Sequence, residues 1–254
     1  LDGLPNIVNV MIMAMEVLCD YGWYPHERID KKTRSYRPLG LGFANLGGLL
    51  MEHGIPYGSR RGRKWASEIM ATITGAAYAQ SARMAKSLGT FEMYPFARRS
   101  FLRVINKHRM AAKQLQDSWI DDLWDQATKL GEQYGFRNAQ VTVLAPTGTI
   151  GLAMDCETTG IEPELALVKY KNLIDGGILK YTNPLVWDAL LSLGYDEFTS
   201  DKIFEWVVSH DGDIFSCPDL EEEHHDVFLT SFPPPGSTKC LGWRDHVDMM
   251  GACQ

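Results

Sequence analysis

The stretch Val141–Gly151 reads VTVLAPTGTIG and combines residue types that can bind an anion through the main chain. Pro146 fixes the entry to a turn and donates no N–H, while Gly148 lacks a Cβ, so a ligand can approach the backbone closely. Thr147 and Thr149 add hydroxyl donors or helix caps. Amides at a helix start point outward and carry a partial positive charge, which makes an anion site without lysine. The residues that we expect to bind phosphate are Pro146, Thr147, Gly148, Thr149 and Ile150.

Other nucleotide-binding patterns are incomplete in this chain. Gly40-Leu-Gly42 begins like a dinucleotide fingerprint, but Asn45 stands where the third glycine belongs. We therefore expect close packing of a strand against a helix at these glycines. No Gly-Lys-Ser/Thr is present, which excludes a Walker loop. The strand–turn–helix junction alone is only moderately specific, because many such junctions bind nothing.

Cysteines and histidines allow a metal site or a nucleophile without favouring either. The metal-ligating types in the C-terminal part are Cys217, His224, His225 and Cys240. Their spacing is irregular and lacks a Cys-x-x-Cys pair, so we predict no metal site. The run Glu221-Glu222-Glu223 is more typical of the first turn of a solvated helix. Cys156 follows the turn, but without a base placed beside it we expect a structural thiol and assign no catalytic residue.

The composition is that of a globular protein in a reducing compartment. The 254 residues carry a net charge of −7, so no basic surface that binds nucleic acid is expected. Five widely spaced cysteines argue against a disulfide framework and for a cytoplasmic location. The apolar stretch Ile7–Leu18 contains Asn9 and Glu16 and is too short to span a bilayer, so no membrane partner is expected. Because the chain begins with Leu1 and stops at Gln254 straight after an amphipathic segment, we interpret it as a fragment.

Helical and strand patterns follow one another in the manner of an α/β fold. Two stretches, Arg37–Phe43 and Ala139–Leu144, are expected to be strands, and each leads into a helix-compatible segment. That order places function at the carboxyl ends of the strands. The helices expected from apolar periodicity and stop signals are Asn6–Tyr21, Ala44–His53, Arg63–Leu88, Phe96–Ile105, Trp119–Tyr134, Pro184–Leu193, Lys202–Ser209 and Trp243–Cys253. No repeat or linker divides the chain, so we expect one domain over residues 1–254.

Residues 145–163, APTGTIGLAMDCETTGIEP, closely resemble the substrate-phosphate segment of vitamin B12-dependent (class II) ribonucleotide reductases. Residues 166–171, ALVKYK, continue the likeness. Residues 37–48, RPLGLGFANLGG, resemble a strand–helix unit that the family has upstream, and residues 243–254 are also similar. The likeness covers nearly the whole chain, and its long ordered match is far more specific than the turn alone.

The resemblance implies a fold and an activity. The family's catalytic domain is a ten-stranded α/β barrel made of two five-stranded halves, and this chain would be about half of it, rich in helix. With adenosylcobalamin, a finger-loop cysteine becomes a thiyl radical that abstracts the ribose 3′ hydrogen, and a cysteine pair supplies electrons for removal of the 2′-hydroxyl. The parent protein would be an adenosylcobalamin-dependent ribonucleoside-diphosphate reductase, with the substrate's phosphates on residues 146–150.

The family's radical residues are missing from this chain. None of the five cysteines stands in the Asn-x-Cys-x-Glu pattern that surrounds the radical cysteine in the family. The family places that finger loop upstream of the matched segment and a second, re-reducing cysteine pair beyond Gln254. We therefore expect the isolated fragment to be inactive and carry over only the phosphate loop.

The resemblance also implies partners. These are a ribonucleotide, the remaining half of the same barrel and a thioredoxin-type reductant, with a homo-oligomer possible. Met11, Met13 and Met15 would lie in the core or on a surface for the missing half. Half a barrel exposes strand edges and apolar surface, so the isolated chain is expected to self-associate or be poorly stable. Two alternatives stay open: a non-catalytic phosphate-binding or scaffold module with only ancestral likeness to reductases, and a different phospho-ligand enzyme on an α/β barrel.

Overall fold

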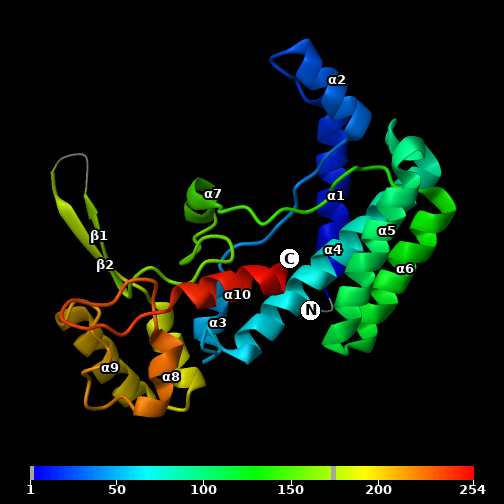
Figure 1. The fold of residues 1–254 in the computed structure, drawn as a ribbon. Coiled ribbons are helices and arrows are strands. Elements are labelled where there is room, and N and C mark those ends of the chain that lie inside the picture. Colours follow the sequence, from blue (N-terminus) through cyan, green and yellow to red (C-terminus); the bar gives the residue numbers. More distant parts are fainter. Residues whose placement is uncertain (1–2, 173–175) are drawn as a thin grey trace. The chain divides into compact units, whose positions relative to one another are not determined.

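The computed structural model describes residues 3–172 and 176–254 of the chain (Figure 1). Helix predominates, and all eight helices expected from the sequence are present. The chain forms two compact units, which are Leu1–Gly42 with Ser67–Val143 (unit 1) and Phe43–Ala66 with Leu144–Gln254 (unit 2). The boundaries between the units fall before Phe43, inside the longest helix after Ala66, and after Val143.

Unit 1 is a group of helices around an aromatic core. Its elements are α1 (Leu4–Tyr21), α2 (Glu27–Tyr36), the part of α4 (Arg60–Leu88) that follows Ala66, α5 (Tyr94–Ala112), the short 3-10 helix η1 (Lys113–Leu115) and α6 (Ser118–Tyr134). In this unit α5 and α6 lie side by side (Figure 1). The aromatic rings that contact one another in its core are those of Tyr78, Phe91, Tyr94, Phe101 and Phe136. Each such pair contributes about 0.5–1.5 kcal/mol of stabilisation beyond that from burial of the rings.

The two stretches expected to be strands are extended and parallel but do not form regular strands. The main-chain hydrogen bonds between them run from Leu39 N to Gln140 O (2.8 Å), from Leu41 N to Val141 O (2.9 Å) and from Val143 N to Leu41 O (2.9 Å). These bonds make one isolated bridge, between Leu41 and Thr142. The prediction of strands at Arg37–Phe43 and Ala139–Leu144 is therefore wrong within the described residues, because a lone pair of short stretches has no further neighbours to complete a ladder.

The glycines of this pair allow the two stretches to approach closely. A Cβ on Gly42 would lie 2.3 Å from the carbonyl oxygen of Val143, and one on Gly40 would lie 3.0 Å from Val143 Cγ1. The expectation that a strand packs against a helix at these glycines is wrong. The backbone does approach closely, but the neighbour is the extended stretch that contains Val143.

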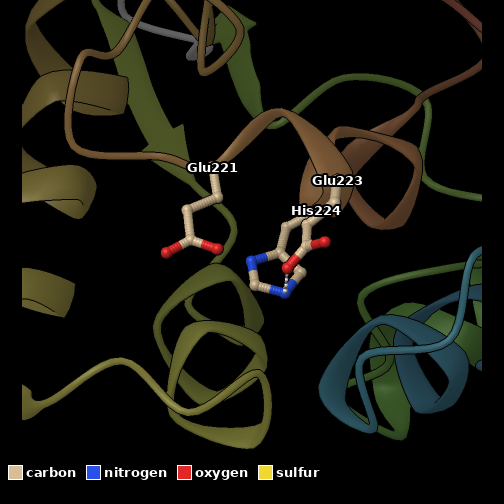
Figure 2. A group of neighbouring side chains, drawn as sticks. All are labelled: Glu221, Glu223 and His224. Carbon is tan, nitrogen blue, oxygen red and sulfur yellow. Dashed lines mark ion pairs between the residues drawn. The ribbon is translucent and has the colours of Figure 1, made fainter.

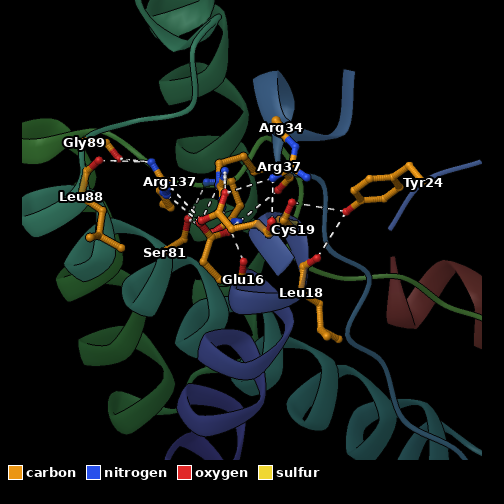
Figure 3. A network of polar contacts seen from close by, with 12 residues as sticks. Glu16, Leu18, Cys19, Tyr24, Arg34, Arg37, Ser81, Leu88, Gly89 and Arg137 are labelled. Atoms are coloured by element: carbon orange, nitrogen blue, oxygen red, sulfur yellow. Dashed lines mark hydrogen bonds and ion pairs between the residues drawn. The ribbon is translucent and has the colours of Figure 1, made fainter. Parts of the chain in front are cut away.

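A buried ion-pair network holds the start of both stretches against α1 (Figure 3). Glu16 is 4% exposed. Its carboxylate accepts hydrogen bonds from Arg37 Nε (2.5 Å), Arg137 Nε (2.6 Å) and Asn138 Nδ2 (2.6 Å). Asp20, one turn along α1, pairs with Arg37 at 2.8 Å, and this hydrogen bond holds the pKa of Asp20 below its usual value. Since Arg37 is the first residue of one extended stretch and Asn138 directly precedes the other, the network fixes where both of them start.

The face of α1 opposite this network is apolar and exposed. Its side chains recur every three or four residues along the helix and are Ile7, Val10, Met11, Val17, Leu18 and Tyr21, each more than two-fifths exposed. We call this set the α1 stripe. Met13 is also exposed, which places two of the three methionines of the predicted set on the surface. No described residue covers the stripe, and exposed apolar patches of this kind are typical of interaction surfaces.

By length and composition alone, α1 is apolar enough to cross a membrane, a test that the core helices of soluble proteins also pass. The expectation that the stretch is too short was wrong, since the helix extends beyond Ile7–Leu18 to Leu4–Tyr21. The paired Glu16 carboxylate nevertheless fixes one face of this helix to unit 1. We therefore retain the absence of a membrane partner as a prediction.

Unit 2 contains short helices and one hairpin. Its elements are α3 (Leu46–Glu52), the start of α4, α7 (Gly148–Ala153), β1 (Val168–Asn172), β2 (Ile178–Thr182), α8 (Leu185–Ser192), α9 (Glu197–Ser209), the 3-10 helix η2 (Glu222–Phe228) and α10 (Trp243–Cys253). Its core lies between α8, α9 and η2, with fully buried Val186, Leu190, Ile203, Val207 and Phe228. β1 and β2 pair antiparallel with Tyr170 opposite Lys180, and the sequence analysis did not predict this hairpin.

Candidate functional site

The predicted phosphate loop is the sharp turn between the extended stretch that ends at Val143 and helix α7. Thr147, the residue before α7, has φ 52° and ψ 31°, in the left-handed region. A β-branched residue adopts this conformation rarely, at a cost of about 1–3 kcal/mol. Strain of this kind persists only where surrounding contacts impose it, and it is concentrated at functional sites.

The Thr147 side chain imposes part of this geometry. Its hydroxyl oxygen accepts a hydrogen bond from the Gly160 amide at 2.7 Å, and its carbonyl accepts one from Gly151 N at 2.7 Å. The sequence predicted Thr147 as a possible helix cap, and this is wrong: its side chain makes no capping hydrogen bond to α7. The hydroxyl instead ties the loop to a segment 13 residues later.

The main-chain donors of the loop are free. The amides of Gly148, Thr149 and Ile150 donate to no acceptor among the residues that the structure describes, and all three residues are exposed. A Cβ built on Gly148 meets nothing within 4 Å, so the space in front of this residue is open. The helix that follows has only six residues, so its dipole contributes less than the sequence pattern suggested. Any anion held here would be bound mainly by these amides.

A second set of contacts holds the segment to which Thr147 is tied. Asn45, itself at φ 67°, accepts a hydrogen bond from Thr158 N at 3.0 Å through its side-chain oxygen. The Thr158 hydroxyl in turn accepts from Gly48 N at 3.2 Å. Leu46 N donates to the carbonyl of Gly160 at 3.3 Å. The start of α3 therefore holds residues 158–160 by hydrogen bonds, and Gly160 in turn is hydrogen-bonded to Thr147 of the loop.

These segments pack so closely that two positions have no room for a Cβ and must be glycine. Gly160 has φ 50°, and a Cβ there would lie 2.6 Å from the carbonyl oxygen of Ala145. A Cβ on Gly47 would lie 2.7 Å from the carbonyl oxygen of Glu162 and 2.8 Å from Pro163 Cα. Substitution at either glycine would push α3 or the loop away from the segment between them.

After this segment, Lys169, the first lysine of β1, forms an ion pair with a buried carboxylate. Lys169 Nζ lies 2.9 Å from Glu164, whose carboxylate also accepts from Asn183 Nδ2 at 2.6 Å. Burial raises the pKa of Glu164 against the lowering effect of Lys169. Tyr181 on β2 donates to Glu157, and Lys169 also lies near this carboxylate. Lys169 is thus committed to carboxylates of its own unit.

The cysteines form no reactive centre among the described residues. All five are free thiols. Cys156 donates to the carbonyl of Met154, with no histidine or carboxylate placed as its base. Burial raises the pKa of the Cys19, Cys217 and Cys253 thiols, that of Cys253 to about 11. A raised pKa keeps a thiol protonated and poorly nucleophilic at neutral pH.

The four residues considered as metal ligands do not come together in the described part of the chain. His224 instead lies with Glu221 and Glu223, with ligand atoms within 4.8 Å of one another (Figure 2). The His224 Nδ1 atom is hydrogen-bonded to the Tyr195 hydroxyl at 2.8 Å, and both glutamates are exposed. His225 Nδ1 accepts from Lys239. Exposed carboxylates beside a histidine are common without an ion, and no further feature here points to one.

Comparison with known proteins decides the family. A family model described as the barrel domain of ribonucleotide reductase matches residues 1–254. This chain belongs to that family. A vitamin B12-dependent ribonucleotide reductase of Rhodopirellula baltica is 45% identical over 97% of the chain, and one of Streptantibioticus cattleyicolor is 39% identical over 98%. A vitamin B12-dependent ribonucleoside-diphosphate reductase of Mycobacterium tuberculosis is 30% identical over 91% of the chain.

The chain spans only part of these relatives: 24% of the Rhodopirellula protein, 42% of the Streptantibioticus protein and 28% of the Mycobacterium protein. Membership of the reductase family confirms the resemblance found in the sequence. The structure brings together residues 37–48 and 145–163, two of the stretches that resemble the family, since the start of α3 contacts residues 158–160. Sequence reasoning missed Asn45, Thr158 and Gly160 as the residues that hold the loop. The signal available for them was that the stretches containing them, 37–48 and 145–163, both resemble the same family.

Proposed function

We propose that the parent protein reduces ribonucleotides to deoxyribonucleotides by the thiyl-radical route, and that this segment holds the substrate's phosphates. The observation that carries the proposal is the set of free amides at Gly148, Thr149 and Ile150, in a loop of reductase family sequence. Three adjacent amides without acceptors suit the oxygens of a phosphate. Together with the Thr149 hydroxyl, they would hold the phosphates and set the ribose in place.

The contribution of such a loop is positional. A substrate fixed at one end presents its ribose in one orientation, which converts binding energy into a favourable reacting geometry. The strain at Thr147 and its hydrogen bond to Gly160 keep the donors in place before the substrate arrives. Little conformational entropy of the loop is therefore lost when the substrate binds.

The radical chemistry belongs to other residues. Adenosylcobalamin, when bound by the parent, would supply the means of forming the thiyl radical. The five thiols of this chain do not fit the role of radical cysteine, since none has the family's flanking Asn and Glu and three are buried. We therefore place the cofactor, the radical cysteine and the electron-supplying cysteine pair in the remaining chain, and expect the isolated 254 residues to be inactive.

Diphosphates are the substrates that we propose. One relative is named as a ribonucleoside-diphosphate reductase. We further propose that these residues form about half of a ten-stranded barrel, completed by the rest of the parent chain, and that a thioredoxin-type protein re-reduces the parent. The extended pair at Leu41 and Thr142 would become part of a regular sheet once neighbouring strands are supplied. The five free thiols suit the reducing cytoplasm that we propose as its location.

The test is Gly148→Val in the parent enzyme. Because a Cβ at this position meets no protein atom within 4 Å, the branched side chain leaves the fold intact and obstructs only an approaching ligand. We expect KM for a ribonucleoside diphosphate to rise at least about tenfold, with a smaller rise for Gly148→Ala. Unchanged KM and turnover in Gly148→Val would refute the loop's role. Finding no Asn-x-Cys-x-Glu motif in the parent gene would favour the non-catalytic alternative.

A further inference from the structure

Helix α5 has a charge pattern opposite to that of the chain as a whole. The protein carries a net charge of −7, yet α5 contains five lysines and arginines and no acidic residue over Tyr94–Ala112. Two of the cations are committed, since Arg98 donates to the Glu132 carbonyl and Arg109 pairs with Asp125. The remaining three have no ion-pair partner within the described residues. Such local concentration of one sign attracts partners of the other.

The three free cations form a row on the exposed side of the helix. Arg99, Arg103 and Lys107 are four residues apart, so they lie on one face and span about 12 Å along the axis. The same face continues into exposed apolar side chains at both ends, with Phe96 85% exposed and Met110 54% exposed. The row is therefore a charged strip with an apolar contact available at each end.

Beside this row lies a hollow of about 260 Å³ in unit 1. Its lining is mostly apolar and comprises Tyr78, Ser100, Phe101, Val104, Ile105 and Ala139. On the helical wheel, Ser100 and Val104 neighbour the cation row, so the row and the hollow adjoin on α5. A volume of this size accepts one large side chain.

Tyr78 gives the hollow a polar donor. The residue is 8% exposed, and its side chain is part of the lining of the hollow. Burial raises the pKa of Tyr78 to about 12, so the hydroxyl keeps its proton at physiological pH. A ligand group inserted into the hollow could therefore accept a hydrogen bond from this hydroxyl.

We propose that α5 is a docking site for an acidic polypeptide segment, which lays a row of carboxylates along Arg99, Arg103 and Lys107 and inserts one side chain into the adjoining hollow. An acidic helix matches the strip because its own side chains recur at the same four-residue spacing. An acceptor on the inserted group would accept a hydrogen bond from the Tyr78 hydroxyl. The proposal concerns recognition of a partner and does not depend on the phosphate loop.

Two other classes of partner suit this surface less well. A membrane-surface helix needs a broad apolar face directed at the lipid, and the apolar face of α5 is buried within unit 1 at Tyr94 and Ile105. A nucleic acid is held by many cations over an extended surface, and here three lie in a single 12 Å row on an acidic protein. Both remain outcomes of the test.

The probe is a synthetic, fluorescently labelled helical peptide of roughly 20 residues, with glutamate at every fourth position and leucine on the neighbouring stripe. Its matched control has glutamine for each glutamate. Fluorescence anisotropy with the parent protein should show the glutamate peptide binding at least about tenfold more tightly, with the difference shrinking as salt is raised. Anionic phosphatidylserine vesicles and oligo(dT) are tested in parallel.

Three variants make the test specific. The triple variant Arg99→Gln, Arg103→Gln and Lys107→Gln should lose at least about tenfold in affinity for the glutamate peptide. Ser100→Trp, which fills the hollow and leaves the charge unchanged, should lose at least about fivefold. The control, Arg28→Gln with Lys31→Gln and Lys32→Gln on exposed α2, removes the same charge and should change affinity less than about twofold. Far-UV circular dichroism checks that each variant is folded.

The proposal is overturned by any of three results. The first is an equal loss of affinity in the α2 control, which would indicate a response to net charge alone. The second is unchanged binding in the α5 triple variant. The third is tighter binding of vesicles or oligo(dT) than of the glutamate peptide, which would assign the row to a membrane or a nucleic acid.

Discussion

The hydroxyl of Thr147 accepts a hydrogen bond from the Gly160 amide at 2.7 Å, across 13 residues of sequence. This bond joins a strained loop residue to a segment that the start of α3 holds independently through Asn45 and Thr158. A six-residue helix with an exposed first turn has little packing of its own to fix its amides. The Thr147–Gly160 bond supplies that restraint from outside the helix.

Replacing Thr147 with valine tests this restraint. Valine keeps the shape of threonine but lacks the acceptor, so the Gly160 amide loses its partner in a half-buried position. We expect Thr147→Val to lower the free energy of unfolding by about 1–3 kcal/mol and to raise KM in the parent enzyme. Urea denaturation and steady-state kinetics measure the two effects. Thr147→Ser retains the hydroxyl and is the matched control, and equal behaviour of the two variants would contradict the role given to the bond.

Glu16 is predicted to be among the most sensitive positions of unit 1. Its removal leaves the buried Arg37 and the mostly buried Arg137 without their shared carboxylate. Breaking a buried pair by removing one partner costs about 3–5 kcal/mol, so Glu16→Ala should destabilise the chain by that amount. Asp20→Ala, which removes a half-exposed carboxylate from the same network, should cost less than about 1 kcal/mol. Similar denaturation midpoints for the two variants would count against Glu16 as the centre of the network.

The same network predicts a modest acid sensitivity. The hydrogen bond from Arg37 lowers the pKa of Asp20 below its ordinary 3.8. A lowered pKa in the folded state contributes stability above the unfolded value, and this contribution is lost as pH falls through the lowered pKa. The free energy of unfolding should therefore decline more steeply below pH 3.8 in the natural chain than in Asp20→Asn. Parallel pH profiles of the two proteins would show that Asp20 contributes nothing. The exposure of its side chain keeps the expected difference small.

Self-association of the isolated chain should depend on the α1 stripe. Val10 and Leu18 are 59% and 63% exposed, and no described residue covers them. Introducing charge with Val10→Glu and Leu18→Glu should shift the chain toward monomer in sedimentation velocity, because a buried charge opposes an apolar interface. Gln133→Glu, on the exposed side of α6, adds a negative charge away from the stripe and should leave association unchanged. A natural chain that is monomeric at high concentration would contradict the prediction.

Much of the helical content was predictable because apolar periodicity is a local signal. α10 was predicted with its correct bounds, and α5 and α9 were predicted but proved longer than expected. α2 was missed because its sequence, ERIDKKTRSY, has few apolar residues, and none of its side chains is buried. The hairpin of β1 and β2 was missed because its strands pair lysine with tyrosine and carry little of the apolar alternation typical of strands.

The site could be predicted in part. The location of the loop and the availability of its amides followed from the residue types at 146–150, and the structure leaves the amides of Gly148, Thr149 and Ile150 unbonded within its described residues. The left-handed conformation of Thr147 could not be predicted, since β-branched residues avoid it and only the contact with Gly160 explains it. The prediction of regular strands at Arg37–Phe43 and Ala139–Leu144 was wrong because strand pairing depends on neighbours that are distant in sequence.

Amide hydrogen exchange of the loop in the parent enzyme tests the central claim most directly. The Gly148, Thr149 and Ile150 amides are exposed and lack acceptors, so they should exchange rapidly without ligand. A ribonucleoside diphosphate should slow their exchange, and the matching ribonucleoside without phosphates should not. Equal exchange of these three amides in the presence and absence of the diphosphate, at a concentration that saturates turnover, would show that the substrate's phosphates lie elsewhere.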